Sequence, residues 1–394
     1  MSTPGRVIIV GGGTFGVSAA IELRRRGWGA DLFDPGPIPH PLAATTDISK
    51  VLRMDYGADE DYMALMEQAF QGWDAWNRVW KEPLWHETGL VVMSHGEMKP
   101  GGFEYESYHL LQKRGHQVER LDSEGLKRRF PAWNAEHYRD GYFNPRAGWA
   151  ESGRVLEWLA SEAKRLGVKF HLGRKFSRLL DRDSRVTGIQ TDDGEKHFAD
   201  FVIVAAGTWT PHLLPYLSNV LWTVFQPVFH FQVPDMELFS PPRFAVWGAD
   251  PSNTGWYGFP AIQDGRLKLA SHGPGWRFDP DGPRVMPADQ EEKFRTFLRE
   301  TFPALADAPV LFNRLCPYCD SWDGNFWIDH DPDRPGLVVA AGDSGHGFKF
   351  TPVLGKLIAD VLEREPNEFA SKFAWRARGA LAREDARYSD DESQ

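Results

Sequence analysis

The sequence predicts an α/β fold in which a discontinuous nucleotide-binding domain carries a second, inserted domain of antiparallel strands. Three observations support this prediction. A glycine-rich turn lies between an apolar run and a helical stretch near the N-terminus, four short apolar runs are spread along the chain, and the stretches between them are rich in Trp, Phe, Tyr and Pro. In addition, 394 residues are more than one compact core usually holds, so two domains are expected.

The first 34 residues have the pattern of a βαβ unit. Residues 7–10 (Val-Ile-Ile-Val) form a short apolar run, which is typical of a strand buried on both faces. A helical stretch follows over residues 17–26, and Gly27 is placed to end it. Residues 30–33 then predict a second strand, which leads into Asp34.

The later apolar runs predict the rest of a parallel sheet. Residues 201–205 and 337–341 are expected to form buried strands next to the first two. Periodicity and turn signals predict further elements: helices over 152–166 and 353–363, a strand over 168–171, and a hairpin of 186–191 with 196–198.

These elements divide the chain into two domains. The nucleotide-binding domain is expected to comprise residues 1–85, 151–220 and 326–385, and the inserted domain residues 86–150 and 221–325. The inserted segments alternate in a way that favours antiparallel strands. The charged tail after about Ala380 is expected to fray.

The turn at residues 11–16 fits the pattern G-x-G-x-x-G of dinucleotide-binding folds. In that pattern the glycines permit a tight turn, close approach of a pyrophosphate to the backbone, and close packing of helix on strand. The pyrophosphate lies at the helix N-terminus, and the acidic residue after the second strand accepts hydrogen bonds from the ribose. The residues expected to bind the dinucleotide are Gly11, Gly13, Thr14, Phe15, Gly16 and Asp34.

This turn alone does not distinguish FAD from NAD. The strand at 201–205 runs into Ala206-Gly207-Thr208-Trp209, and such a small-residue turn recurs in FAD-binding folds of the glutathione-reductase type. It therefore favours FAD and places Gly207 near the cofactor. An ordinary strand end with a glycine is the alternative.

Charge and composition exclude several classes of protein. A net charge of −10 disfavours binding to nucleic acid or to anionic membranes. No apolar run approaches the roughly 18 residues that a membrane span needs. The N-terminal residues do not resemble a signal peptide, and 2 cysteines provide neither a disulfide framework nor a zinc site. We expect a soluble, cytoplasmic protein, and a monomer is an option that the sequence leaves open.

Three segments late in the chain carry a family resemblance. They are residues 316–319 (Cys-Pro-Tyr-Cys), 326–329 (Phe-Trp-Ile-Asp) and 340–350, which contains Ser-Gly-His-Gly-Phe-Lys. The chain resembles, from Val7 to about Leu362, the monomeric sarcosine oxidase family of flavin amine oxidases, which includes N-methyltryptophan oxidase, pipecolate oxidase and the amadoriases (fructosyl amino acid oxidases). The resemblance implies a D-amino acid oxidase-like fold and FAD bound as 8α-S-cysteinyl FAD through Cys316.

The resemblance also implies roles for individual side chains. Arg53 and Lys349 match the pair that holds the substrate carboxylate, and Lys268 matches the lysine that promotes oxygen reduction. His272 and Tyr257 match active-site residues. The residues implied to lie against the flavin are Thr46, Lys50, Gly345, His346, Gly347, Phe348 and Lys349.

Two departures bear on the substrate. Sarcosine-type enzymes have histidine and arginine where this chain has Thr46 and Lys50. The pattern Asp47-x-x-Lys50-x-x-Arg53 is closer to that of amadoriases, as is Asp343. The resemblance thus implies an oxidase of secondary amines on N-alkyl, cyclic or fructosyl amino acids, in which a hydride equivalent passes to flavin N5, the imine hydrolyses and O2 becomes H2O2.

Alternatives remain at this point. Cys316 and Cys319 also fit the pattern C-x-x-C of redox dithiols. The preferred interpretation of Cys319 is instead a small buried residue. Spacing alone would place Lys268 and His272 on a half-exposed strand face. The rival functions are a flavin dehydrogenase with another electron acceptor and a non-catalytic dinucleotide-binding protein.

Overall fold

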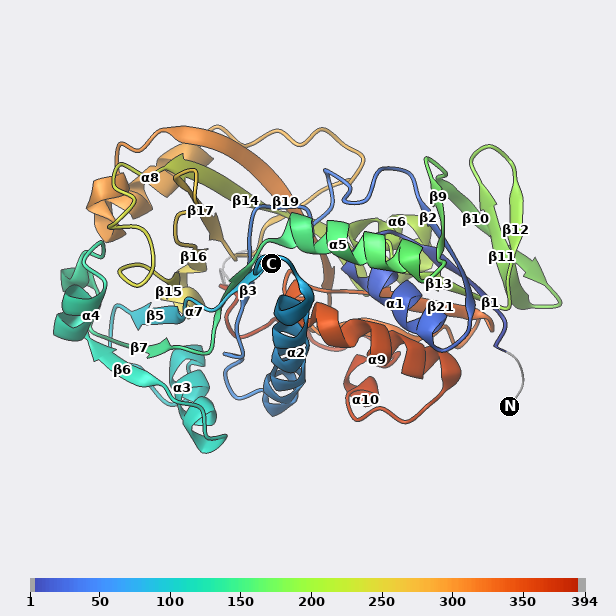
Figure 1. The fold of residues 1–394 in the computed structure, drawn as a ribbon, viewed down its shortest axis with the longest axis horizontal. Helices are drawn as coiled ribbons and strands as arrows, with labels where there is room; N and C mark the ends of the chain where they lie inside the picture. Colours follow the sequence, from blue (N-terminus) through green and yellow to red (C-terminus); the bar gives the residue numbers. More distant parts are fainter. Residues whose placement is uncertain (1–3, 389–394) are drawn as a thin grey trace.

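A computed structural model describes residues 4–388, and its elements form two groups at opposite ends of the long axis (Figure 1). One group contains the parallel sheet with α1 and α9, and the other contains the strands β5–β7 and β15–β17 with α3, α4 and α8. The long strands β14 (Leu221–Gln232) and β19 (Val310–Ser321) pair with each other and run between the groups.

The first group is built on a six-stranded sheet in the order β20-β21-β13-β1-β2-β9. Neighbouring strands from β21 to β9 are parallel, and β20 is antiparallel to β21. The strands are β1 (Arg6–Val10), β2 (Gly29–Asp34), β9 (Lys169–Leu172), β13 (Phe201–Val204), β20 (Trp327–His330) and β21 (Leu337–Ala341). The predicted parallel sheet is therefore confirmed.

Both faces of this sheet are covered, which explains the uninterrupted apolar runs. Val7 and Ile9 belong to the core that they share with three helices, α1 (Thr14–Arg25), α5 (Ser152–Arg165) and α9 (Thr351–Glu363). Ile8 and Val10 point to the other face, as the two-residue period of a strand requires. There they pack with residues of a three-stranded sheet of β10 (Phe176–Arg182), β11 (Arg185–Thr191) and β12 (Lys196–Phe198).

Two details differ from the sequence prediction. Helix α1 begins at Thr14, directly after the glycine turn, rather than at residue 17. The predicted hairpin of β11 and β12 is present, but β10 extends it on the other side and was not predicted, because its polar and apolar residues neither alternate nor form a long apolar run.

The second group is a nine-stranded sheet in the order β18-β14-β17-β16-β15-β5-β7-β6, with β19 also paired to β14. Its remaining strands are β5 (Leu90–Ser94), β6 (Glu119–Asp122), β7 (Asp140–Asn144), β15 (Val246–Ala249), β16 (Trp256–Gly258), β17 (Arg266–Ser271) and β18 (Trp276–Arg277). All pairs are antiparallel except β5 with β15, which corrects the expectation of a purely antiparallel sheet. This exception joins the two inserted segments side by side.

A small sheet bridges the two groups. β8 (Gly148–Ala150) pairs with β3 (Lys50–Leu52) and with β4 (Trp85–His86). The other α-helices are α2 (Glu60–Val79), α3 (Phe103–Lys113), α4 (Ser123–Arg129), α6 (Thr210–Leu213), α7 (Pro251–Thr254), α8 (Gln290–Thr301) and α10 (Ala370–Phe373).

The segment after residue 380 does not fray as predicted, at least as far as Tyr388. Ala386 and Arg387 are buried, and Arg387 Nη1 donates to Asp320 at 2.8 Å. The expectation failed because two of the charges in this segment, Glu384 and Arg387, are paired with Arg53 and Asp320, which lie far away in the sequence. Residues 389–394 lie outside the described part of the chain.

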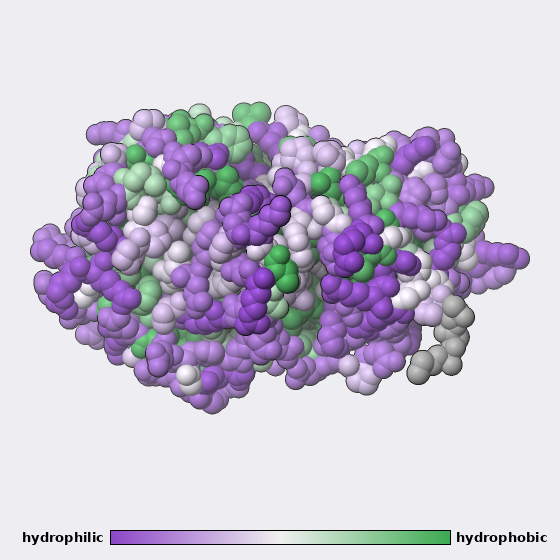
Figure 2. All heavy atoms as spheres, in the orientation of Figure 1, coloured by the Kyte–Doolittle hydropathy of each residue, from purple (hydrophilic) through white to green (hydrophobic). Residues whose placement is uncertain are grey.

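The surface carries both polar and apolar residues. On the face shown in Figure 2, apolar residues form small groups between polar ones. Within residues 4–388, no helix combines the length and the hydrophobicity that crossing a membrane requires.

Candidate active site

A cavity of about 280 Å³ lies where β1 ends and α1 begins. The turn between them has the conformation that its glycines make possible. Gly11 has φ +109°, and a Cβ at Gly16 would lie 1.9 Å from the carbonyl oxygen of Gly11. A side chain at either position would therefore open the turn.

Gly13 differs from these two glycines because space is open in front of it. A Cβ there would meet only Thr45 Oγ1, at 3.9 Å, and Gly13 is the N-cap of α1 without a side-chain cap. The first N–H groups of α1 and its positive dipole end thus face the cavity, which suits a pyrophosphate. The sequence-predicted Thr14 and Phe15 also line this cavity.

Asp34 lines the same cavity at the end of β2. Its carboxylate accepts hydrogen bonds from the backbone N–H of Gly12 at 2.8 Å and of Gly36 at 2.9 Å. Burial raises the pKa of Asp34 above its usual range, although both N–H groups act in the opposite direction. The carboxylate is thereby held at the position where a ribose would be recognised.

The opposite wall comes from later strands. Gly207, with φ +53°, follows β13 and lines the cavity together with Trp209 and Asp343. The loop 40–45 forms a third side and is held by Arg314, which donates to the carbonyl oxygens of Ala43 and Thr46. Thr46 itself faces away, since its hydroxyl donates to His40 O at 2.6 Å, and Thr45 lines the cavity instead.

A second cavity of about 100 Å³ lies beyond β19 and the segment 343–349. Pro317 and Asp343 line the first cavity, whereas Tyr318, the next residue after Pro317, and Gly345, two residues after Asp343, line the second. Its lining includes these sequence-predicted residues: Lys50, Arg53, Tyr257, His272, Gly345, His346, Phe348 and Lys349.

The glycines of the segment 343–349 allow close packing between the two cavities. A Cβ at Gly345 would lie 2.2 Å from the ring of Tyr318, and one at Gly347 would lie 2.9 Å from the ring of Phe15. The segment leads into α9 through a 3₁₀ turn, Phe348–Phe350.

Cys316 lies on β19 with its side chain buried on the face that carries Tyr318. Lys50 Nζ is 3.5 Å from its sulfur. Cys319 packs in a different core, because residues three apart on a strand point to opposite faces. Both thiols are free, and burial raises the pKa of Cys319 far above its usual value. This geometry excludes a Cys316–Cys319 dithiol pair and agrees with the small buried residue expected at Cys319.

Lys349 is buried at the floor of the second cavity. Its ammonium donates to Tyr56 Oη at 2.9 Å and to His346 O at 3.0 Å. Burial and the neighbouring Arg53 lower the pKa of Lys349 to about 7. Burial likewise lowers the pKa of His346 to about 3, so that its ring is neutral.

Arg53 meets an unexpected partner. Its Nη2 donates to Glu384, whose other carboxylate oxygen is 3.4 Å from His272 Nε2. The guanidinium also lies over the rings of Tyr56, at 4.9 Å, and Phe103, at 5.5 Å. Arg53 Nη1 is buried and has no hydrogen-bond partner within the described part of the chain.

Lys268 is placed behind the cavity wall. It is 1% exposed, and its Nζ donates to Asp47 Oδ2 at 2.7 Å and to Ser49 O at 2.6 Å. Burial lowers the pKa of Lys268 to about 8, although Asp47 opposes this shift. The expectation from spacing, a half-exposed strand face, is therefore wrong for Lys268, because β17 is covered on both faces.

The model of the family described as FAD dependent oxidoreductase matches residues 6–361 of this chain. The protein belongs to this family. The chain is 30% identical over 371 residues to N-methyl-L-tryptophan oxidase of Salmonella dublin, which covers 92% of this chain and 96% of that protein. It is 29% identical over 410 residues to L-saccharopine oxidase of Schizosaccharomyces pombe, with 94% and 93% covered.

Solved structures agree with these sequence matches. Fructosamine oxidase (Amadoriase II) from Aspergillus fumigatus superposes with a TM-score of 0.85 at 26% identity, over 99% of this chain and 95% of that one. Amadoriase I from the same organism gives a TM-score of 0.82, also at 26% identity, over 100% and 95%. The predicted family resemblance and D-amino acid oxidase-like fold are confirmed.

The residues of this FAD-dependent oxidoreductase fit the cofactor of its family. The open space at Gly13 and the uncapped start of α1 suit the pyrophosphate, and Asp34 suits a ribose. The cavity extends to Asp343 and Pro317, so the two halves of a dinucleotide can be accommodated along one path.

Sequence reasoning missed several residues of the second cavity. Phe103 and Tyr318 line it, and Tyr56 holds Lys349. Tyr318 could have been found, because it lies two residues from Cys316 on one strand and therefore on the same face. Glu384 carried no signal, since a single acidic residue in a charged tail is normally solvated.

Proposed function

We propose that this protein is a FAD-dependent oxidase of secondary amines on amino acids, with its substrate bound in the second cavity. The observation that carries the proposal is the convergence of two buried cations, Arg53 and Lys349, on a cavity that adjoins the dinucleotide cavity. Glu384 already pairs with Arg53, but Lys349 donates only to neutral oxygens, so the two cations together favour a further anionic ligand group. The names of the relatives support N-alkyl, cyclic or fructosyl amino acids as substrates.

Bound FAD would supply the acceptor for a hydride equivalent from the substrate carbon and would pass the electrons on to O2, giving H2O2. The residues expected to hold it are those of the glycine turn, Asp34, Thr45 and Gly207. Cys316 is the proposed attachment residue. Its place directly before Pro317, which lines the first cavity, and 3.5 Å from Lys50 Nζ, which belongs to the lining of the second, supports this assignment.

Arg53 and Lys349 would orient the substrate carboxylate. Arg53 and Lys349 both line the cavity, and Lys349 offers an ammonium whose pKa of about 7 allows both charge states near neutral pH. A carboxylate fixed at two points aims one C–H bond, which is the positioning contribution to catalysis.

Tyr257 and His272 form another wall of this cavity. Burial raises the pKa of Tyr257 to about 12 and lowers that of His272 below its usual range, so both side chains are neutral. Neutral walls favour binding of the amine in its unprotonated form, and no strong base is then required.

Lys268 is proposed to promote oxygen reduction, as the family resemblance implies. Its ammonium is fixed by Asp47 at 2.7 Å, and a fixed positive charge favours the first electron transfer to oxygen. Its place behind the wall, next to Lys50 and Phe259, implies that the effect is electrostatic rather than a direct contact with substrate.

The substrate class is tested by a peroxide assay across a panel of N-methyl, cyclic and fructosyl amino acids. We expect turnover on at least one class and none on the corresponding primary amines. Absence of turnover on every member, in protein that retains FAD, would refute the oxidase and favour a binding protein. If the enzyme is reduced anaerobically by a substrate but reoxidises slowly in air, the acceptor is not O2 and a dehydrogenase is favoured.

Covalent attachment is tested separately by acid precipitation. Wild-type protein should carry its yellow colour into the pellet, whereas Cys316→Ala should release it into the supernatant. Cys319→Ala is the matched control and should behave as wild type. Colour found wholly in the wild-type supernatant would refute the covalent bond.

A further inference from the structure

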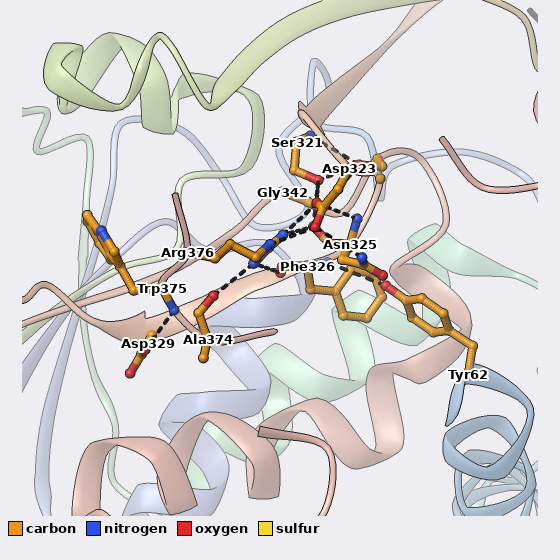
Figure 3. A network of polar contacts seen from close by, with 12 residues as sticks. Tyr62, Ser321, Asp323, Asn325, Phe326, Asp329, Gly342, Ala374, Trp375 and Arg376 are labelled. Atoms are coloured by element: carbon orange, nitrogen blue, oxygen red, sulfur yellow. Dashed lines mark hydrogen bonds and ion pairs between the residues drawn. The ribbon is translucent and has the colours of Figure 1, made fainter. Parts of the chain in front are cut away.

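The C-terminal segment returns to the substrate cavity and is fixed at both ends. At its start, Arg376 donates from two nitrogens to the carboxylate of Asp323, each at 2.7 Å, and from Nη1 to Phe326 O (Figure 3). The preceding backbone N–H of Trp375 donates to Asp329 at 2.7 Å.

The far end is anchored equally well. Arg387 donates through Nη1 to Asp320 at 2.8 Å and through Nε to Gly273 O at 2.9 Å. The backbone N–H of Ala382 donates to Trp322 O at 2.9 Å, and that of Tyr388 donates to His272 O at 3.1 Å. Because residues 375–388 are anchored on both sides, this segment is an ordered part of the cavity wall.

Glu384 lies between these anchors and is directed at Arg53. Its side chain is 5% exposed and lines the cavity together with Ala386. The backbone approaches closely here, since a Cβ at Gly324 would lie 3.0 Å from Glu384 N. The carboxylate is therefore held by the path of the chain as well as by the ion pair.

The charges around Glu384 come from several elements. Arg53 and Lys349 are the cationic groups, His272 and His346 are neutral rings, and Asp55 is a second acid near Arg53. Burial would raise the pKa of Glu384, but the ion pair with Arg53 and the hydrogen bond with His272 hold it well below its usual range. The pocket therefore contains its own carboxylate on the arginine that would receive one from a substrate.

We propose that Glu384 is a specificity-determining residue, which occupies the carboxylate position on Arg53 and disfavours a second carboxylate beside it. This inference rests on the proposed function. A substrate acid then binds at Arg53 and Lys349 against repulsion from Glu384. Among amino acids with a secondary amine, the favoured substrates are those whose acid group lies away from Glu384, relative to compact N-alkyl or cyclic α-amino acids.

The test compares matched substrate pairs in the holoenzyme of wild type and Glu384→Gln. The pairs are N-methyltryptophan with N-methyltryptamine and pipecolate with piperidine, which differ only in the carboxylate. We expect Glu384→Gln to lower KM for the acid by fivefold or more, with kcat and the KM of the decarboxylated partner changed less than twofold. An unchanged or raised KM for the acid, or an equal change for both partners, would overturn the inference.

Two further variants separate charge from structure. Glu365→Gln removes an exposed charge from a residue outside the cavity and should leave every KM unchanged. Glu384→Asp keeps the charge but withdraws it from Arg53, and should lower KM for the acid by a smaller factor. If Glu384→Gln does not fold, the Glu384→Asp result decides.

A measurement without turnover distinguishes failure of this inference from failure of the proposed function. Acetate, with chloride at equal ionic strength as control, should raise the Tm of the Glu384→Gln holoenzyme clearly more than that of wild type. If this shift appears although no amine is oxidised, the role of Glu384 holds and the reaction is wrong. If amines are oxidised but neither the shift nor the KM split appears, the reaction holds and the inference is wrong.

Discussion

The dinucleotide cavity and the substrate cavity adjoin each other but are built differently. The first is centred on the backbone of the glycine turn, whose residues 11–15 line it in one continuous run, and later segments complete its walls. The second is bounded by side chains that reach it from Lys50 to Ala386, through almost the whole chain. A backbone site tolerates few substitutions in its turn, whereas a side-chain site can change its ligand by exchanging one residue.

The largest effect is expected at the turn. Gly16→Ala places a Cβ 1.9 Å from Gly11 O, which is a backbone atom that cannot move without opening the turn. We expect at least a tenfold loss of retained FAD, measured as the ratio of flavin to protein absorbance. Gly96→Ala is the matched control, because a Cβ there meets no atom within 4 Å. Retention of FAD by Gly16→Ala would contradict a rigid backbone site.

The substrate cavity should instead lose affinity without losing cofactor. Lys349→Met removes the buried ammonium and keeps a side chain of similar length. A charged hydrogen bond contributes about 1.5–3 kcal/mol, so KM for a carboxylate substrate should rise by roughly 10- to 150-fold. FAD content should stay at the wild-type level. Lys293→Met, at an exposed lysine, serves as control in the same steady-state assay. An unchanged KM would show that the carboxylate lies elsewhere.

The pH dependence of the same lysine gives a smaller effect. The charged form of Lys349 attracts a carboxylate and is lost as pH rises through about 7. Binding of acetate, followed by the flavin absorbance, should therefore weaken by up to about tenfold between pH 6 and 8.5, and the dependence should be flatter in Lys349→Met. A wild-type profile as flat as that of the variant would argue against this titration.

The stability of the folded protein should change with pH in the direction opposite to that of acetate binding. The folded-state pKa of Lys349 lies below its ordinary value of 10.5, so the folded protein binds fewer protons than the unfolded chain between these two pH values. The contribution of this group to the free energy of unfolding therefore rises with pH across that window. Denaturant unfolding of wild type against Lys349→Met at both ends of the window measures it.

The smallest effect is expected at Cys319. Cys319→Ser buries a hydroxyl in an apolar core and should cost about 1–3 kcal/mol in the free energy of unfolding, with FAD attachment and KM unchanged. Thermal unfolding measures the loss of stability, and acid precipitation measures the flavin attachment. Loss of flavin attachment in this variant would revive the dithiol that the strand geometry excludes.

The same contrast explains which features could be predicted from the sequence. The βαβ unit, the buried strands and the glycine turn are contiguous patterns, in which local residue types determine local conformation. Arg53 and Lys349 were reached only through the family resemblance, because no local pattern relates two residues almost 300 positions apart. The resemblance implies that both hold one carboxylate, and both line one cavity in the structure.

Glu384 and Lys268 show why the remainder escaped prediction. A charged residue is expected to be solvated unless its partner is known, and the partners Arg53 and Asp47 lie 331 and 221 positions away. Pairing over such distances depends on the assembled fold rather than on composition. Thr46 was predicted to lie against the cofactor, but its neighbour Thr45 lines the cavity and Thr46 only holds the loop. The sequence pattern could not distinguish between these two adjacent threonines.

The anchored C-terminal segment has a practical consequence for handling the protein. Glu384 and Arg387 lie near the end of the chain, so an affinity tag or fusion partner attached there would load the wall of the substrate cavity. The other terminus leads into Arg6, at the exposed start of β1 and at the far end of the long axis (Figure 1). Purification tags, immobilisation on a sensor surface and fusions to a reporter are therefore best made at the N-terminus.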